Sequence, residues 1–458
     1  MRFAAITITV ICCILMFKVK RPTKAAIFIM GAMTLTLVRV PFLPLQKANF
    51  IFPIVFLLSE WNYLKRHLKD FWHTPSLKYP VLVVIVSTII CILSSPRLSC
   101  SFMSAFMFFR GELILKYFAI CYAFWAYSSE TSIKLTLKVS FYCLLVLTFF
   151  GILNYYSGSA IFVNAVTVGR TSWIKDDAAL GDVFIDSDRF RVISMFRHPF
   201  DYGFVCSAIF LLHFHGVCQQ LESRRRFIIA ALCCLFGIYF CGCRTVWVAS
   251  AMAFICYSLW SFKLKKTSAW GLMAIIALIL SYGVVPFIEE KMDQVSDILS
   301  DNPQTNGSSL KLRQSQFETM MDLLDEENEM TGQGEGYFAY DLGFADQFSD
   351  RRSQVLARGL YGMESVIFKY VLERGYLGLF LWALFYILIF IFFVKNRHKY
   401  KRLTGLGVSF VVLYLFFSIG TGELGSVYPT MLLLGFVIKA IEYDKRIKSN
   451  YNLNHSCQ

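Results

Sequence analysis

Charged residues are scarce in this sequence, and their scarcity argues against an ordinary soluble protein. They account for 17% of the 458 residues, against roughly 25% in soluble domains. Internal repeats of roughly 20–50 residues and low-complexity tracts are also missing. The abundant residues are instead apolar, at 56%, and aromatic, at 17%. The composition therefore predicts one polytopic membrane bundle rather than the two or three soluble domains that this length allows.

Motifs for nucleotides, metals and nucleic acids are lacking as well. The stretch "QGEGYFAYD" (333–341) lacks the G-x-x-x-x-G-K-[ST] pattern of a phosphate loop, and its glycines are expected to let the backbone approach a ligand or another loop. Cys241 and Cys243 form a C-x-C with no second pair nearby, and Asp186 and Asp188 form a lone D-x-D, so no metal and no cofactor is predicted. The net charge of +14 lies in short basic clusters between apolar runs, without an RNA- or DNA-binding motif. Nucleic acid is therefore not an expected partner.

These basic clusters define the predicted topology. Lysine and arginine in short loops mark the cytoplasmic side, and a helix needs about 20 apolar residues to cross the bilayer. About thirteen spans fit between the clusters, and every cluster then falls on one side; because the first, third and last spans are short, twelve or fourteen remain possible. The N-terminal segment is interpreted as a first span, because its basic flank follows the apolar core, the reverse of a cleaved signal peptide. The predicted spans are 2–17, 25–41, 46–60, 80–95, 113–128, 139–156, 201–218, 227–242, 246–262, 268–287, 370–394, 404–419 and 427–441.

Two long segments fall on the opposite, external face. In the second, sixteen acidic residues stand against six basic ones over residues 289–364, which is typical of an external insert. Apolar residues at helical spacing in "SSLKLRQSQFETMMDLLDEENEM" predict a surface helix over the membrane mouth. The expected fold is all-α, a transmembrane helix bundle with two large external loops, the second partly helical. The predicted divisions are N-terminal helices 1–156, first external loop 157–200, central helices 201–287, second external loop 288–369, C-terminal helices 370–441 and a cytoplasmic tail 442–458.

Five arginines near the external membrane boundary are candidate ligands for an anionic group. Arginine presents a rigid fork of donors that suits phosphate and carboxylate oxygens. Arg244 lies between two predicted spans with almost no loop, where an ionisable group is costly and often functional. Its alternative role is to reach lipid headgroups or to pair with a structural carboxylate. The five candidates are Arg189, Arg191, Arg197, Arg244 and Arg313.

Two residues are candidates for a catalytic base. His198, in "RHPFDYG", belongs to the residue type that titrates near neutral pH, although it could equally start the following helix. Glu364 lies where the acidic segment re-enters the bilayer; a carboxylate in low-dielectric surroundings can act as a base, and the alternative is an ion pair with one of the arginines. Asp201 fits a helix cap or an arginine partner better than a catalytic role. Glu373 and Arg374 lie deeper and are typical of an intramembrane structural pair.

Four stretches, in order, resemble segments of the O-antigen polymerase and O-antigen ligase superfamily. "RVISMFRHPFDYGFVCSAIFLL" is similar to the family's arginine, small loop and hP-x-x-G at the start of a span, and "CGCRTVWVASAMAF" to its S-R-(S/T)-x-W segment. "LKLRQSQFETMMDLL" followed by "GQGEGYF" resembles its R-x-x-x-(W/F)…G-x-G-x-(G/Y) pair, and "ESVIFKYVLERGYLGLFLWALFYI" its closing L-x-E-x-G-x-x-G-L helix. The resemblance covers about residues 189–394, whereas the N-terminal third matches only in hydropathy.

The resemblance implies a metal-independent glycosyl transfer in the bacterial inner membrane, with the active site facing the periplasm and a polyprenyl diphosphate as leaving group. A departing diphosphate needs cationic stabilisation, which agrees with the arginines at the membrane boundary. By position, the implied diphosphate ligands are Arg191, Arg244 and Arg313, followed by Arg197. The residue that would accept or orient the acceptor hydroxyl is Glu364 or His198.

One departure from the family pattern bears on whether the reaction is that of a polymerase or of a ligase. Ligases carry a histidine before the closing helix, and this sequence has Glu364 there, which favours a polymerase of O-antigen or capsule repeat units over a ligase. The alternatives are a ligase that transfers a finished glycan to a lipid or protein acceptor, and a non-enzymatic flippase. A flippase is expected to carry ionisable groups through the middle of several spans, whereas the predicted charges concentrate at the outer boundary. The expected partners are the bilayer, an undecaprenyl-diphosphate-linked oligosaccharide, a chain-length regulator and a flippase.

Overall fold

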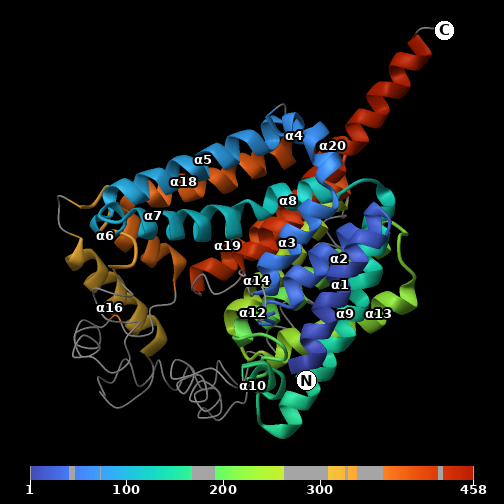
Figure 1. Ribbon diagram of the computed structural model, residues 1–458. Helices are drawn as coiled ribbons and strands as arrows, with labels where there is room; N and C mark the ends of the chain where they lie inside the picture. The colour runs from blue at the N-terminus through green and yellow to red at the C-terminus, as the bar shows by residue number, and fades with distance from the viewer. Residues whose placement is uncertain are drawn as a thin grey trace.

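The chain folds into a bundle of helices (Figure 1). The computed structural model describes residues 2–40, 47–72, 74–167, 191–262, 308–324, 328–337, 360, 365–420 and 426–456, and in these residues an isolated bridge between Arg39 and Lys47 is the sole β-type pairing. The helices are α1 (Arg2–Lys18), α2 (Arg21–Thr34), α3 (Ala48–Ser59), α4 (Trp61–Trp72), α5 (Pro75–Ser94), α6 (Pro96–Ser99), α7 (Phe102–Phe109), the π-helix η1 (Arg110–Tyr117), α8 (Ala119–Ala126), α9 (Glu130–Ser157), α10 (Ile161–Thr167), α12 (Pro199–Cys218), α13 (Arg224–Phe240), α14 (Arg244–Ser261), α16 (Ser308–Leu323), α18 (Val366–Asn396), α19 (Lys401–Gly420) and α20 (Val427–Ser456).

Local sequence explains where the longer helices begin and end. Helix α9 starts with a capping box of Ser129 and Ser132 and stops at Gly158, whose φ of 62° is left-handed. Helix α12 starts after His198, whose ring accepts a hydrogen bond from the backbone N–H of Phe200, and it has proline in its first turn. Proline is tolerated in the first turn because a backbone N–H at that position would have no acceptor within the helix.

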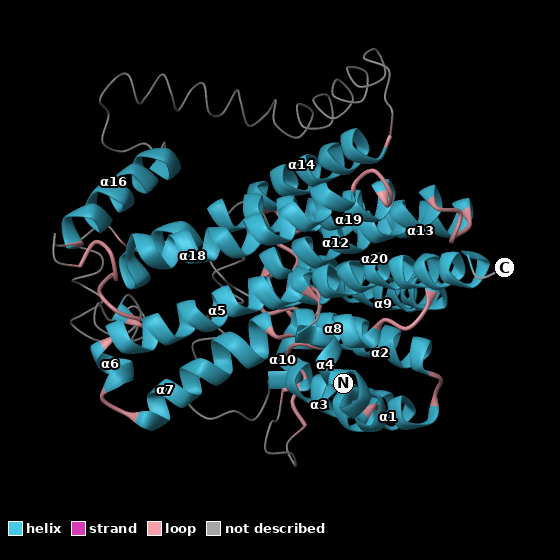
Figure 2. Ribbon diagram, turned by 90° about the horizontal axis from the view of Figure 1, so that it is seen from above, coloured by secondary structure: helices cyan, strands magenta, loops and turns pink. Residues whose placement is uncertain are grey.

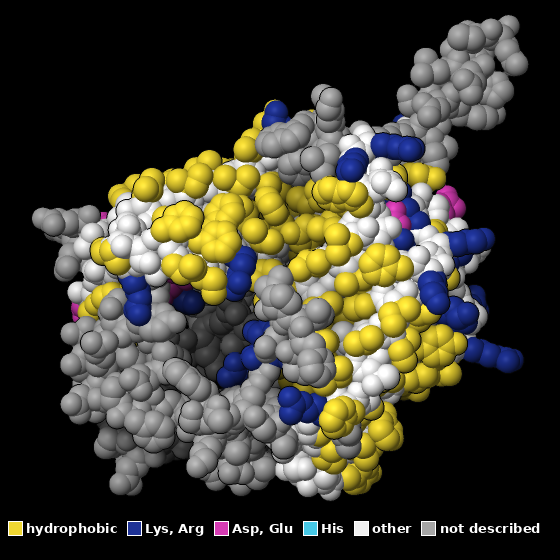
Figure 3. Space-filling view, viewed as in Figure 1, with side chains coloured by type: hydrophobic (Ala, Val, Ile, Leu, Met, Phe, Trp, Pro, Cys, Tyr) yellow, Lys and Arg dark blue, Asp and Glu magenta, His cyan; other side chains and the backbone are white. Residues whose placement is uncertain are grey.

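The distribution of apolar side chains is that of a membrane protein. Helices α5, α9, α12, α18 and α19 are long and apolar enough to cross a bilayer. Helices α12 and α19 are largely buried in the centre of the bundle, whereas α5, α9 and α18 present apolar side chains such as Leu93, Phe149 and Phe380 on the outside. The space-filling view shows such side chains covering much of one face (Figure 3). An outer layer of this kind fits contact with lipid, and the expected all-α membrane fold is confirmed.

The predicted spans other than 268–287 overlap helices of the structure. The helix through predicted span 113–128 starts earlier than expected, at Phe102, and passes through η1 before α8. Span 268–287 lies outside the described residues, so the count of thirteen stays a prediction, as do the predicted domain limits. Helices α5 and α18 run side by side along one edge of the bundle (Figures 1 and 2).

Helix α18 is broken at Gly375, and the loop 328–337 fills the break. Gly375 has φ 64° and ψ −171°, which interrupts the helical ladder. The carbonyls of Leu372 and Glu373 accept hydrogen bonds from the N–H groups of Gln333 and Gly334, at 2.8 and 3.0 Å. In return, the N–H groups of the two residues after Gly375 donate to the carbonyls of residues 329 and 330, at 2.9 and 3.1 Å. Residues 328–337 thus satisfy the backbone groups that the break exposes.

Two glycines make this close backbone approach possible. A Cβ on Gly332, which has φ 73°, would lie 2.5 Å from backbone atoms of Glu373, Arg374 and Gly375, and one on Gly375 would overlap the backbone of Met330. The glycines of 333–341 are expected to let the backbone approach a ligand or another loop; the N–H of Gly334 instead bonds the Glu373 carbonyl of helix α18.

The predicted surface helix is present as α16, beside the first turns of α18 (Figure 2). Met320 and Leu324, two of its regularly spaced apolar residues, are buried against Val371 and Leu372 of α18. The same small core includes Tyr337 at its edge, so α16 and the loop 328–337 are anchored on one helix.

Candidate functional site

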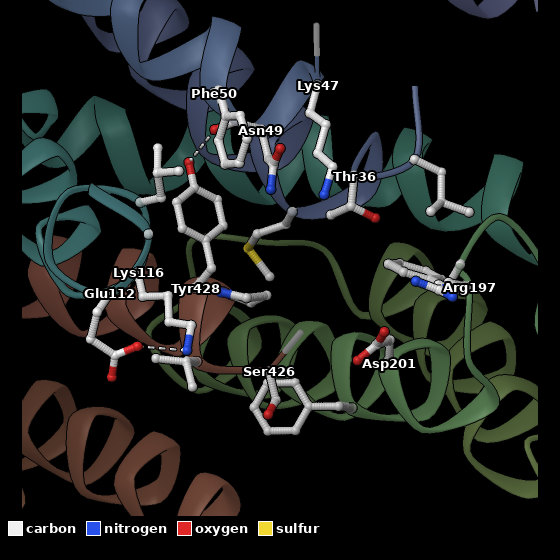
Figure 4. Close-up of a pocket in the computed structure, with 18 of the residues that line it drawn as sticks. Thr36, Lys47, Asn49, Phe50, Glu112, Lys116, Arg197, Asp201, Ser426 and Tyr428 are labelled. Carbon is white, nitrogen blue, oxygen red and sulfur yellow. Dashed lines mark hydrogen bonds and ion pairs between the residues drawn. The ribbon is translucent and has the colours of Figure 1, made fainter. Parts of the chain in front are cut away.

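The structure contains a cavity of about 560 Å³ where the ends of several helices meet. Its lining comes from α2 and the segment after it, the start of α3, α7, η1, the start of α12, the loop 328–337 and the start of α20 (Figure 4). The volume is in the range of small-molecule sites, roughly 300–1,000 Å³. A hollow with Lys and Arg side chains beside it is visible on the surface (Figure 3). Polar groups at the cavity are Thr36, Lys47, Asn49, Glu112, Lys116, Arg197, Asp201, Glu335, Ser426 and Tyr428.

Cations gather on one side of the cavity. Lys47 and Arg197 line it, and Figure 4 shows both side chains directed toward its interior. The Arg39 backbone pairs with that of Lys47. Burial, and then the charge of Arg197, lower the pKa of the Arg39 guanidinium. An anion bound near Arg39 and Arg197 relieves the repulsion between these two positive charges.

Ion pairs form the opposite end of the cavity. Glu112 accepts hydrogen bonds from Lys116 at 2.8 Å and from Arg374 at 3.1 Å. Arg374 also donates to Glu335 at 2.8 Å, so Lys116, Glu112, Arg374 and Glu335 form a chain of alternating charge. The Tyr370 hydroxyl donates to Glu112 at 3.3 Å, and the Arg374 guanidinium lies 4.3 Å from the Tyr370 ring centre. This ion-pair chain satisfies most of its own hydrogen-bonding groups, as buried charges require.

The break in α18 positions part of the ion-pair chain. Arg374 directly precedes Gly375, and Glu335 belongs to the loop that fills the break. The same backbone hydrogen bonds that hold this loop therefore bring Glu335 against Arg374 and to the cavity wall. Arg374 thus pairs with carboxylates from two distant elements, whereas Glu373, its expected partner, lies 3.7 Å from Lys369.

The loop before α12 is fixed by hydrogen bonds to neighbouring helices. Ile193 donates its N–H to the Asn154 side chain at 2.9 Å, and Ser194 donates its hydroxyl to the Leu147 carbonyl at 2.6 Å. The N–H of Val192 donates to the Phe240 carbonyl at 2.9 Å. Ser194 has φ 52°, an unfavourable value for a residue other than glycine. These bonds hold it, and with it the arginines on either side.

The predicted arginines whose side chains are described lie in two places, at the cavity and at the turn between α13 and α14. Arg197 lines the cavity, whereas the Arg191 side chain packs over the turn between α13 and α14, with its Cγ 3.0 Å from where a Cβ on Gly242 would stand. Arg244, exposed, begins α14 just beyond that turn. The structure therefore brings Arg191 beside the Arg244 turn, and both lie outside the described cavity lining.

For three predicted site residues the side chain lies outside the part of the chain that the structure describes. Arg189 and Glu364 are outside the described residues, and for Arg313 the structure describes the backbone, within α16, but not the side chain. Their roles stay predictions.

His198 caps α12 and is held neutral. Burial, and then the charges of Arg191 and Arg197, lower its pKa to about 4. A ring that resists protonation in this way is a poor place to hold a proton taken from a substrate. His198 does not line the cavity.

For Asp201 the sequence favoured a helix cap or an arginine partner over a catalytic role, and the structure shows this carboxylate at the cavity. It lies in the first turn of α12, lines the cavity beside Arg197 (Figure 4), and its Oδ1 is buried without a hydrogen-bond partner among the described residues. Lys47, Glu112, Lys116 and Glu335 were missed altogether. A usable signal existed for Glu112 and Lys116, since "RGELILK" places two basic residues and an acid at the start of predicted span 113–128.

The part of the chain that the structure describes has no group of three His, Cys, Asp or Glu side chains able to hold a metal ion. Fold and site together define an all-α membrane protein with a charged cavity that suits an anionic ligand. Residues 229–383 match the family model described as O-antigen ligase. This match confirms the resemblance to the O-antigen ligase and polymerase superfamily, and does not separate the two kinds of enzyme. A comparison with curated proteins finds no match.

Proposed function

We propose that this chain is a polysaccharide polymerase of the inner membrane. It transfers a growing glycan from undecaprenyl diphosphate to the non-reducing end of another lipid-linked O-antigen or capsule repeat unit, at the periplasmic face and without a metal. The family match supports a glycosyltransferase-like enzyme with a lipid-linked oligosaccharide as substrate. The observation that carries the proposal is a cavity with cations on one side and carboxylates within it.

In this proposal the basic side of the cavity holds the diphosphate. Arg197 and Lys47 bind its oxygens, with Arg39 adding positive charge, and they stabilise the negative charge that develops as the diphosphate leaves. Arg191 and Arg244, together at the α13–α14 turn, and the predicted ligands Arg189 and Arg313 guide the anionic headgroup toward the cavity. The ion-pair chain shapes the end where the sugar lies.

A ligase remains the alternative reaction, because family members of both kinds use lipid-linked glycans. Glu364, where ligases carry histidine, is the reason for favouring a polymerase. A flippase is the non-enzymatic alternative, and Glu112 and Arg374 are the buried ionisable groups that such a transporter also needs.

Deletion of the gene in its host separates the three readings. A polymerase predicts surface glycans of a single repeat, and a ligase predicts full-length glycan that stays on undecaprenyl diphosphate. Accumulation of lipid-linked units on the cytoplasmic face would identify a flippase and overturn both enzymatic proposals.

The diphosphate site is tested with purified protein in nanodiscs and undecaprenyl diphosphate as the probe. Lys47→Ala and Arg197→Ala should each weaken binding by about tenfold or more, since a hydrogen bond to a charged group contributes about 1.5–3 kcal/mol. Lys445→Ala, near the middle of α20 and paired with Glu442, is the matched control and should bind as the wild type does. Unchanged affinity in both cavity variants would remove them from the site.

A further inference from the structure

Three of the described residues that line the cavity are carboxylates, and their surroundings differ. Glu112 is held by Lys116, Arg374 and Tyr370. Glu335 is held by Arg374 at 2.8 Å, with the Cys91 thiol 3.8 Å away. A carboxylate whose oxygens are engaged by cations is a weak proton acceptor, because protonation would break those bonds.

Asp201 differs from both. Its Oδ1 is buried without a hydrogen-bond partner among the described residues, and it lies in the cavity wall. An unpartnered buried carboxylate oxygen is unfavourable unless a ligand group supplies the missing hydrogen. Asp201 lines the cavity, so a ligand group in it, a hydroxyl for example, lies next to this carboxylate.

The neighbours of Asp201 fit the same role. Arg197 lies beside it, and Lys47 points into the same cavity (Figure 4). A diphosphate bound by those cations places the bond to be broken in the cavity that the Asp201 carboxylate lines. His198, three residues earlier, does not line that space.

We infer that Asp201 is the catalytic base of the proposed transfer, a role that rests on the proposed function. The acceptor hydroxyl oxygen attacks the anomeric carbon of the donor sugar, and the new C–O bond forms as the bond from that carbon to the diphosphate breaks. The bonding electron pair leaves with the diphosphate, which Arg197 and Lys47 stabilise. The hydroxyl proton passes to the Asp201 carboxylate and from there to water.

A purely structural role is the competing explanation. An acid in the first turn of a helix is favourable beside the helix dipole, and Asp201 could serve only that purpose. A structural role predicts that Asp201→Asn changes stability without a selective effect on turnover, whereas a base predicts a loss of turnover in a protein that still folds and binds.

The test uses the full chain in nanodiscs with lipid-linked glycan extracted from host cells that lack the gene. Asp201→Asn should lower kcat by about 10²-fold or more, the usual contribution of a general base, while binding of undecaprenyl diphosphate stays within about threefold of wild type. Added formate should raise the rate of Asp201→Ala and leave the wild-type rate unchanged, because a small carboxylate can enter the space left by the side chain. Glu442→Gln is the matched control, since Glu442 lies midway along α20 and does not line the cavity.

Three outcomes would overturn the inference. Asp201→Asn with a kcat within about threefold of wild type would remove the base, most plainly if Glu364→Gln were inactive in the same assay. Loss of diphosphate binding together with turnover in Asp201→Asn would make it a binding residue. A wild-type protein that forms no glycosidic bond would overturn the proposed function, and it is recognised because the control variant is inactive too.

Discussion

The contact between α18 and the loop 328–337, called the joint below, consists of four backbone hydrogen bonds. We expect this contact to separate when Gly375 acquires a side chain. Alanine at Gly375 meets two obstacles: φ 64° with ψ −171° is a region that is essentially restricted to glycine, and the new Cβ overlaps the Met330 backbone. The conformational strain alone costs about 1–3 kcal/mol. If the loop separates, four backbone hydrogen bonds of about 1 kcal/mol each are lost as well, so complete separation costs on the order of 6 kcal/mol.

Gly158 provides the matched control. It has a similar φ of 62°, but a Cβ there meets nothing within 4 Å. Gly158→Ala therefore tests backbone strain without overlap and should cost about 1–2 kcal/mol. Thermal unfolding of both variants in detergent, followed by tryptophan fluorescence, should show a clearly larger decrease of Tm for Gly375→Ala. Cleavage by a protease near residues 328–337 should also be faster in that variant.

A double-mutant cycle makes the reasoning refutable. Gly332→Ala places a Cβ against the same stretch of α18 from the other side. Once one substitution has separated the loop, the second has no contact left to break, so the combined loss should fall well short of the sum. Equal Tm values for Gly375→Ala and Gly158→Ala, or a fully additive double variant, would show that the joint contributes little.

Two further predictions concern charge. Arg374→Met should lower the free energy of unfolding by about 3–5 kcal/mol, because Glu335 loses its Arg374 bond and Glu112 keeps only Lys116 and the Tyr370 hydroxyl. Adding Glu335→Gln should recover part of this loss in thermal unfolding, and no recovery would contradict the pairing. The lowered pKa of His198, about 4, means that the unfolded chain takes up a proton below about pH 6.5 while the folded chain does not. The contribution of His198 to stability is thus complete above about pH 6.5 and declines between about pH 6.5 and 4. His198→Asn keeps a capping acceptor. The difference in Tm between wild type and this variant should change over that pH range and be constant above it.

The sequence predicted the helical membrane fold well, because apolar periodicity and basic loops depend on nearby residues alone. It singled out Arg197, which lines the cavity, because a charge at the start of the apolar helix α12 is a local anomaly. It also identified α16 and the glycine-rich loop from spacing and composition.

The remaining features depend on contacts between distant segments. Glu112 and Arg374 are 262 positions apart in the chain, and a pattern within one span cannot show which carboxylate an intramembrane arginine will meet. The break in α18 was equally hidden, because Gly375 is tolerated in a helix and becomes a break only when Gly332 lies against it. Asp201 was undervalued for the opposite reason. Its position near Arg197 in the sequence suggests an ion pair, yet its Oδ1 has no hydrogen-bond partner among the described residues.

The position of the family match divides the cavity into two parts. Of the described lining residues, Glu335 is the one that falls within residues 229–383; the others belong to the N-terminal third, the start of α12 and the start of α20. The matched segment thus contributes the joint of Gly332 and Gly375 with Arg374, which holds Glu112 from the N-terminal part. Substitutions at the joint should therefore impair transfer of any glycan, because they displace the wall as a whole. Substitutions at lining residues such as Thr36 or Asn49 leave that wall in place and should change which glycan is accepted.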